Sequence, residues 1–231
     1  MTDLAIIDYG VGNLRSVERA FAATGNQATI TGDVSVLRHA KGLVLPGVGA
    51  FAACMKALSS RGFDELVRDR VAGGTPLLGI CVGMQLLFET SEEFGNAAGL
   101  SLIRGRVRRL PDEELVPQVG WNQIRKRNFH PILSGIEDDA FVYFVHSYYC
   151  DVDDPALVAG ETDYGITYPS VIGRGDLCGV QFHPEKSQAV GLQMLANFAD
   201  RVRCGSWRDV PQAVQPAESA AENQLRSSDQ S

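Results

Sequence analysis

The stretch TPLLGICVGMQLLFE, residues 75–89, constrains the fold more than any other part of the chain. It opens with a short apolar run, residues 77–80, which is typical of a buried strand, and it closes with apolar residues at helical spacing, residues 84–88. Between them, two glycines flank Cys81 in a G-x-C-x-G turn. A strand that breaks directly into a helix crowds the backbone at the bend and requires small neighbours there. The pattern therefore predicts that a strained turn lifts Cys81 clear of a sheet.

A cysteine in such a turn has two interpretations. The amides and dipole at the start of the following helix favour a thiolate, which is the nucleophilic form. A free cysteine is nevertheless often a small, inert side chain of the core. The turn by itself leaves both interpretations open for Cys81, and the choice depends on what the rest of the chain brings to it.

Composition excludes several classes of protein. The chain has 231 residues, 45% of them hydrophobic and 21% charged, which suits one sizeable domain. A net charge of −7 argues against a nucleic-acid partner. No apolar run is long enough to span a membrane, and the N-terminus lacks the basic region of a signal peptide. Five cysteines without a C-x-x-C pair indicate a reduced, cytoplasmic chain with no disulfide framework, metal or cofactor.

Short apolar runs alternate with helical patterns through the first half of the chain. The expected strands are residues 4–8, 28–31, 42–45 and 77–80, with helices between them. This alternation predicts an α/β fold with a doubly wound, mostly parallel central sheet flanked by helices. Ligands bind such sheets at the carboxyl ends of the strands, so the segments that follow these strands are expected to lie along one edge with Cys81.

After Phe94 the pattern changes to aromatic, β-rich segments separated by polar turns, which predicts an antiparallel or mixed β extension. The arginines within residues 104–109 are interpreted as a solvated strand face or a partner contact rather than a phosphate site. A last strand, residues 177–182, is followed by a helix, residues 188–203. Residues 1–204 are thus expected to form a single domain. The segment 205–231 is poor in large apolar residues and is expected to be a disordered tail.

The second group of candidate catalytic residues is His183-Pro184-Glu185, which follows the last strand. Proline turns the chain and allows Glu185 to approach the imidazole two residues earlier. A base beside a thiol, oriented by an acceptor, is the arrangement that nucleophilic catalysis requires. A histidine at a strand end is more often structural, and three others compete for the role: His39, His130 and, as the strongest rival, His146.

Glycines also follow the third strand, in the segment Pro46-Gly47-Val48-Gly49. Their peptide N–H groups are free to point at a developing oxyanion, with Val48 or Gly49 as the donor. A plain strand-to-helix turn is the simpler interpretation of the same residues.

Taken together, these motifs resemble the class I (triad) glutamine amidotransferases. Within that group the chain is similar to the glutaminase subunits of imidazole glycerol phosphate synthase. The resemblance rests on six blocks: IDYGVGNLRSV (7–17), LPGVGAF (45–51), GICVGMQLLF (79–88), VGWNQI (119–124), HSYY (146–149) and QFHPEKS (181–187).

The resemblance implies a class I glutamine amidotransferase fold and a mechanism. Cys81 attacks the glutamine side-chain amide to form a glutamyl thioester, His183 is the acid and base, and Glu185 orients it. The strand that carries Val48 and Gly49 supplies the oxyanion donors, and in this family it is misaligned until partner and effector bind.

The resemblance also implies the surroundings of this chemistry. Gln85, Ser147 and Tyr148 line the glutamine pocket. Ammonia passes to a separate cyclase subunit of (β/α)8 fold, the partner in a heterodimer, which makes imidazole glycerol phosphate and a purine-pathway by-product in histidine biosynthesis. The residues that would face this partner are Asn13, Trp121 and Lys186.

Three alternatives stay open at this stage. A paralogue on the same fold would supply ammonia to a different acceptor synthase, and only the partner separates the two. A non-catalytic binding protein would have lost at least one triad member, whereas Cys81, His183 and Glu185 are all present. A cysteine peptidase of related architecture would cleave peptides rather than free glutamine.

Overall fold

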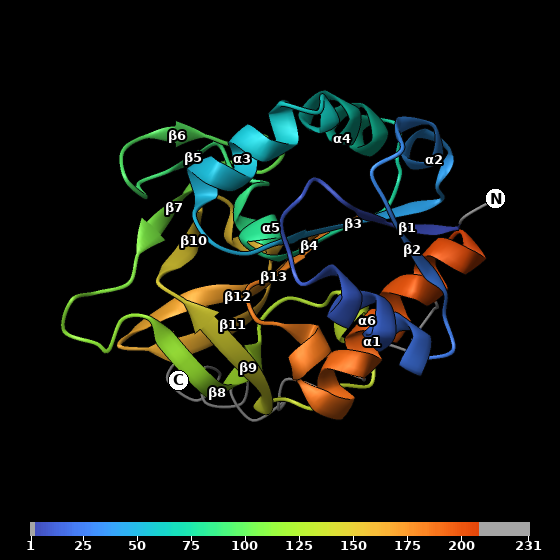
Figure 1. Ribbon diagram of the computed structural model, residues 1–231. Helices are drawn as coiled ribbons and strands as arrows, with labels where there is room; N and C mark the ends of the chain where they lie inside the picture. The colour runs from blue at the N-terminus through green and yellow to red at the C-terminus, as the bar shows by residue number, and fades with distance from the viewer. Residues whose placement is uncertain (1–2, 208–231) are drawn as a thin grey trace, which may run out of the picture.

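The computed structural model describes residues 3–207, and its largest element is a long mixed sheet (Figure 1). The described strands of this sheet are, in spatial order, β2 (Ala28–Thr31), β1 (Leu4–Ile7), β3 (Gly42–Gly47), β4 (Leu77–Cys81), β13 (Leu177–Val180), β12 (Ile166–Arg174), β11 (Val158–Tyr164), β8 (Gln118–Lys126) and β9 (Ala140–His146). The first five are parallel to one another, and the last four continue the sheet with antiparallel pairing. The predicted α/β fold with a mixed extension is therefore confirmed.

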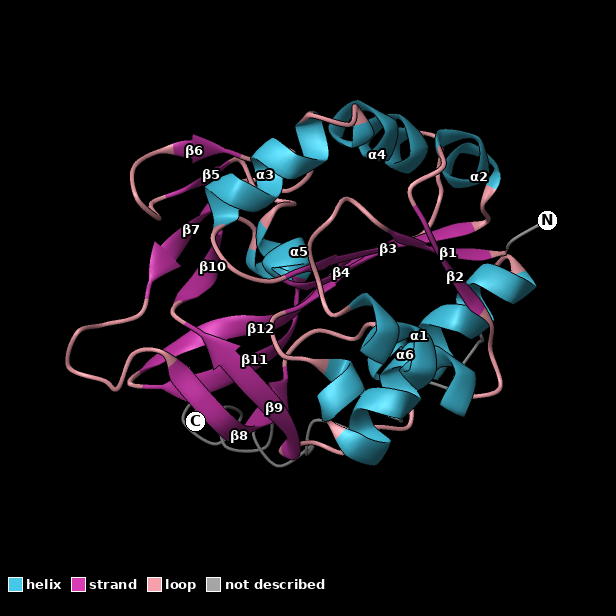
Figure 2. Ribbon diagram, viewed as in Figure 1, coloured by secondary structure: helices cyan, strands magenta, loops and turns pink. Residues whose placement is uncertain are grey.

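Helices cover both faces of the parallel half (Figure 2). One face carries α1 (Leu14–Ala23) and α6 (Gln188–Cys204), and the other carries α2 (Val34–His39), α3 (Phe51–Ser59) and α4 (Phe63–Ala72). Every residue of β1, β3, β4 and β13 is consequently buried. This double cover explains why these strands appear in the sequence as continuous apolar runs rather than as alternating patterns.

A second, smaller sheet lies beside strand β12 of the long sheet. Its described strands are, in spatial order, β10 (Tyr148–Val152), β7 (Gly105–Arg109), β5 (Thr90–Ser91) and β6 (Ala97–Ala98). Arg106 and Arg108 of β7 both lie within ion-pair distance of Asp151 on β10. Their side chains are about half exposed, so the basic run is a solvated strand face, as expected.

The helix after Cys81 is shorter than the sequence pattern predicts. Helix α5 spans only Val82–Gln85, and residues 86–88 form a buried turn. Their carbonyls accept from the following loop: Leu100 N donates to Leu86 O, and Ser101 N donates to Phe88 O. These bonds to another segment replace those that would have continued the helix. Helix α2 and strand β10 are elements that the sequence pattern did not predict.

The expected disordered tail, residues 205–231, lies almost wholly outside the described residues. At the end of the described part, the Trp207 indole Nε1 donates to the Gly175 carbonyl at 3.1 Å. No helix between residues 3 and 207 has the length and apolar character needed to cross a membrane.

The turn at Cys81 packs directly against strand β3. A Cβ on Gly83 would lie 1.8 Å from the Leu45 carbonyl oxygen, far inside any real contact. Replacement of Gly83 by alanine must therefore push β3 away from the turn. We expect Gly83→Ala to lower the free energy of unfolding by about 1–3 kcal/mol, the usual penalty for overpacking, measured by urea denaturation.

A matched control is Gly73→Ala. Gly73 has φ −78, and its nearest neighbours to a new Cβ lie 3.4 Å or more away, so an alanine fits. Equal stability of the two variants would contradict the close approach of β3 to the turn.

Candidate active site

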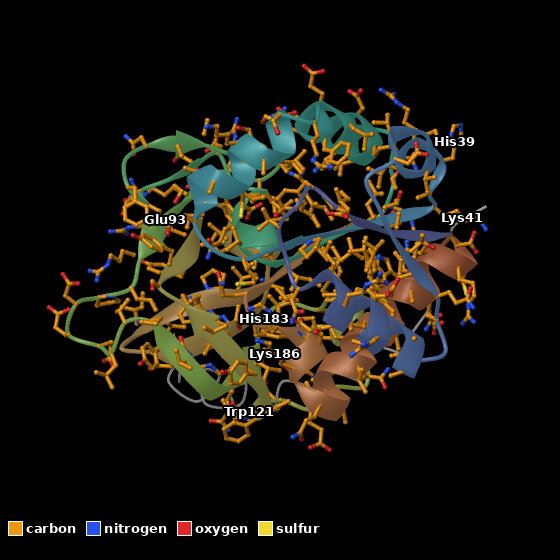
Figure 3. The ribbon with its side chains drawn as sticks, in the orientation of Figure 1. His39, Lys41, Glu93, Trp121, His183 and Lys186 are labelled. Atoms are coloured by element: carbon orange, nitrogen blue, oxygen red, sulfur yellow. The ribbon has the colours of Figure 1, made fainter. Side chains whose placement is uncertain are left out.

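A cavity of about 280 Å³ opens at the carboxyl ends of β3 and β4. It is lined by Val48, Gly49, Cys81, Val82, Gln85, Glu93, Pro117, Val145, His146, Ser147, Tyr148 and His183. Parallel sheets of this kind bind ligands at this edge, so the cavity lies where the topology predicts it. In Figure 3, His183 lies near the middle of the molecule, whereas Trp121 lies at its lower margin.

Cys81 ends β4 in a strained conformation. Its φ of 55° and ψ of −115° are unusual for a residue with a side chain, and it is only 3% exposed. The helix that follows has four residues, so its dipole supports a thiolate less than the sequence pattern suggested. A positive partner for the sulfur must come from elsewhere.

His183 and Glu185 provide that partner. The imidazole Nδ1 donates to the Glu185 Oε1 at 2.8 Å, and the two side chains are 5% and 1% exposed. Pro184 begins the short 3₁₀ helix η3 (Pro184–Lys186), which turns Glu185 back toward the ring. The His183 backbone is fixed at both ends, because its N–H donates to Tyr143 O and its carbonyl accepts from Ser187 Oγ.

The pKa of His183 reflects these contacts. Burial lowers the pKa, but the hydrogen bonds and negative charges of Cys81 and Glu185 outweigh burial and raise it to about 10. The ring is therefore an imidazolium at neutral pH. Its Nδ1–H is used by Glu185, which leaves the other ring nitrogen to face the Cys81 sulfur. The structure thus brings Cys81, His183 and Glu185 together, although they are about a hundred residues apart in sequence.

The rival histidines are engaged elsewhere. His146 lines the cavity, but its Nδ1 donates to Tyr148 O at 2.9 Å and its Nε2 lies 3.1 Å from the Tyr168 hydroxyl. Burial lowers the pKa of His146 to about 4, so its ring is neutral. His130 is bonded to the backbone of Gly175 and Ile132, and His39 to that of Ser35.

Val48 and Gly49 both line the cavity beside Cys81. The Val48 carbonyl accepts from the Cys54 Sγ at 3.3 Å. In a trans peptide the C=O and N–H groups point in opposite directions, so the Gly49 N–H is directed away from Cys54. Gly49 also has φ +85°, a conformation that glycine adopts without strain.

The predicted pocket residues Gln85, Ser147 and Tyr148 all line the same cavity. The Gln85 amide is held in place, because its Nε2 donates to Tyr148 O at 2.9 Å and to Gln181 Oε1 at 3.2 Å. Gln181 is completely buried and was not singled out from the sequence.

Glu93 is a second residue that the sequence reasoning missed. It lines the cavity, and its Oε2 accepts from the Phe51 N–H at the start of α3 at 2.6 Å. Among the described residues that line the cavity, it is the one carboxylate. No local pattern distinguishes Glu93 from neighbouring acids such as Glu89, because its position depends on how the loop after α5 folds back.

The three residues assigned to a partner face are exposed. Trp121 lies 6.0 Å from the Tyr143 ring, and the Lys186 Nζ lies 5.6 Å from the same ring. Tyr143 thus contacts both side chains and links Trp121 on β8 to Lys186 at the end of η3. Asn13 lies apart from these residues, just before α1, where its Oδ1 accepts from Ser16 Oγ. Within residues 3–207, no cluster of three or more His, Cys, Asp or Glu side chains is arranged to hold a metal ion.

Comparison with known proteins agrees with this geometry. The family model described as glutamine amidotransferase class-I matches residues 5–202. Two similar proteins are imidazole glycerol phosphate synthase subunits HisH. The one from Symbiobacterium thermophilum is 48% identical over 87% of this chain and 95% of its own. The one from Chloroflexus aurantiacus is 52% identical over 84% of this chain and 94% of its own.

Solved structures agree at the level of the fold. The structure of PurLQS from Thermotoga maritima matches with a TM-score of 0.67 at 15% identity, over 89% of this chain and 99% of that one. The identity to the curated sequences, over nearly their whole length, is far more specific than this likeness. The chain therefore belongs to the class I glutamine amidotransferases and, within them, to the family of imidazole glycerol phosphate synthase subunits HisH.

Proposed function

We propose that the chain hydrolyses glutamine to glutamate and ammonia as the glutaminase subunit of imidazole glycerol phosphate synthase, in histidine biosynthesis. The observation that carries the proposal is the buried arrangement of Cys81, His183 and Glu185 in one cavity. Residues 1–204 would form the whole amidotransferase domain, which is supported by a family match over residues 5–202.

His183 carries a proton in the resting site, and its contact with Cys81 supplies the cation that a thiolate nucleophile requires. The sulfur attacks the carboxamide carbon of glutamine, and the electron pair of the carbonyl moves to its oxygen. When the tetrahedral intermediate collapses, the C–N bond breaks and His183 gives its proton to the departing ammonia. A water molecule then attacks the thioester while His183 accepts its proton. Glutamate leaves, and the Cys81–His183 pair is restored.

The oxyanion of both tetrahedral intermediates requires hydrogen-bond donors. Gly49 is the better candidate, because its N–H is directed away from Cys54 while the residue lines the cavity. Loss of one such donor costs about 2.7–4 kcal/mol in comparable enzymes. Val48 lies in the same segment and is the second candidate.

The substrate is a zwitterion, and the cavity contains groups for both of its charges. Glu93 supplies a carboxylate for the ammonium, and Gln85 supplies the carbonyl oxygen that its own hydrogen bonds leave free. Ser147 also lines the cavity, and its hydroxyl can donate to the substrate carboxylate. A glutamine residue within a peptide chain has no free α-ammonium or α-carboxylate. This cavity therefore favours free glutamine over a peptidase substrate.

A cyclase subunit of (β/α)8 fold would receive the ammonia in a heterodimer. The strip formed by Trp121, Tyr143 and Lys186 supports a partner face, since it is exposed at one end and adjoins Glu185 at the other. A partner on this strip would touch the segment that positions His183. A reduced compartment, the cytoplasm, suits a chain whose five cysteines are all free and lie within the described residues.

The first test is removal of the nucleophile. We expect Cys81→Ser to abolish measurable glutamine hydrolysis in the presence of the cyclase, because a neutral hydroxyl cannot replace a thiolate. Cys204→Ser, at an exposed cysteine, is the matched control and should retain full activity. Glutaminase activity that survived in Cys81→Ser would refute the proposal.

The second test concerns the proton on His183. The folded pKa, about 10, lies above the ordinary value of 6.5, so the imidazolium stabilises the folded chain fully below pH 6.5 and progressively less as the pH rises through 10. We expect the ring resonance of His183 to titrate well above pH 6.5 in NMR spectra. Glu185→Gln should lower that midpoint and reduce kcat by about 10²–10⁴-fold, since the acid–base group loses its orienting charge. An unchanged midpoint in Glu185→Gln would count against the triad.

The third test concerns the partner. Glutamine hydrolysis should rise strongly when a histidine-pathway cyclase and its ribotide ligand are both added, because the partner face adjoins the catalytic segment. Trp121→Ala should weaken this activation without affecting the cyclase reaction supplied with free ammonia. Equal hydrolysis under all conditions would contradict the assignment of the partner and would favour a paralogue with another acceptor.

A further inference from the structure

Gln181 is a buried amide in contact with the nucleophile. It directly follows strand β13, two residues before His183, and its side chain is 0% exposed. Its Nε2 is directed at the Cys81 Sγ at 3.9 Å, a long hydrogen bond to sulfur that a more strongly accepting thiolate would shorten. Its Oε1 accepts from the Gln85 Nε2 at 3.2 Å. One side chain therefore links the sulfur to the substrate pocket.

The direction of this link is fixed by a backbone group. The Tyr148 carbonyl can only accept, and Gln85 reaches it at 2.9 Å, so the Gln85 amide must present its NH₂ group there. The same NH₂ group also faces Gln181, which must then present its oxygen. The nitrogen of Gln181 is thereby directed at Cys81. Reversing either amide would bring two acceptors or two donors together at one of these contacts.

A donor aimed at a sulfur favours its charged form. A thiolate is a stronger acceptor than a thiol, and hydrogen bonds to a charged group in a buried site are about twice as strong as neutral ones. His183 supplies one donor to the sulfur, and Gln181 supplies a second; both residues belong to the segment that follows β13. With two donors, the sulfur is held in a defined direction as well as charged.

We propose that Gln181 is a positioning residue that holds the Cys81 sulfur as a thiolate directed into the pocket, in an orientation set by the Tyr148 carbonyl through Gln85. This rests on the proposed glutaminase function for its catalytic meaning. The same chain of hydrogen bonds couples the Tyr148 carbonyl in the pocket wall to the Cys81 sulfur, because displacement of that carbonyl releases both amides.

The test is the alkylation of Cys81 by iodoacetamide as a function of pH, followed by mass spectrometry of the peptide that contains it. A Cys204→Ser background removes the exposed thiol. Gln181→Met keeps the side-chain volume and removes both hydrogen bonds. The control is Thr162→Val, which removes a hydrogen-bonded hydroxyl, 1% exposed, that lies away from the cavity.

We expect the pH of half-maximal alkylation to rise by about one unit in Gln181→Met, the size of one hydrogen bond to a charged group, and to stay unchanged in Thr162→Val. With the cyclase and its ligand present, kcat for glutamine should fall about 10-fold or more in Gln181→Met. A Gln181→Met profile equal to that of the control would overturn the proposal, since a purely structural role lowers stability without moving the profile.

Gln85→Met provides an independent variant, and it keeps the proposal testable if Gln181→Met does not fold. It releases the Gln181 amide without removing it, so the profile should move in the same direction by a smaller amount. The double variant should move no further than Gln181→Met, because Gln85 acts on the sulfur through Gln181. No shift in Gln85→Met, or full additivity in the double variant, would contradict the relay.

The alkylation experiment tests the role of Gln181 independently of the glutaminase function. Iodoacetamide is small and needs neither glutamine nor the cyclase. If the wild-type chain showed no glutaminase activity while the alkylation shift was present, the proposed function would fall and the role of Gln181 toward the sulfur would stand.

Discussion

The close contact between strand β3 and the turn at Cys81 is the constraint on which the rest of the site depends. Two glycines meet there: a Cβ on Gly47 would lie 2.6 Å from the Gly83 nitrogen, and one on Gly83 would lie 1.8 Å from the Leu45 carbonyl oxygen. Backbone therefore packs on backbone. The segment that carries Gly49 consequently emerges beside Cys81, so the proposed oxyanion donors lie at a position set by the sheet.

The charged groups beside Cys81, which are His183 and Glu185, come from the segment after the neighbouring strand rather than from a helix dipole. Strand β13 pairs in parallel with β4, so the residues that follow it reach the sulfur directly. Burial alone would lower the pKa of His183, and the hydrogen bonds to Cys81 and Glu185, together with their negative charges, reverse this effect. The three groups are therefore interdependent, because each buried charge is favourable only while its partner is present.

The sequence was informative where structure follows from local pattern. Buried parallel strands, the small residues of the turn and the proline after His183 all constrain nearby backbone, so the sheet and the edge that carries Cys81 could be predicted. Helix α5 was predicted too long, because the bonds that end it come from residues 100–103. Glu93 and Gln181 were missed for a related reason: their roles arise from contacts with distant residues, and an isolated glutamate or glutamine gives no signal of its own.

The account depends on Cys81 being the one thiol that glutamine reaches. A diazoketone analogue of glutamine, incubated with the chain in complex with the cyclase and followed by peptide mass spectrometry, tests this directly. We predict that the label appears on Cys81 and that free glutamine suppresses it, because the other four cysteines lie outside the cavity. Labelling of another cysteine, or labelling of Cys81 that glutamine does not prevent, would contradict the account.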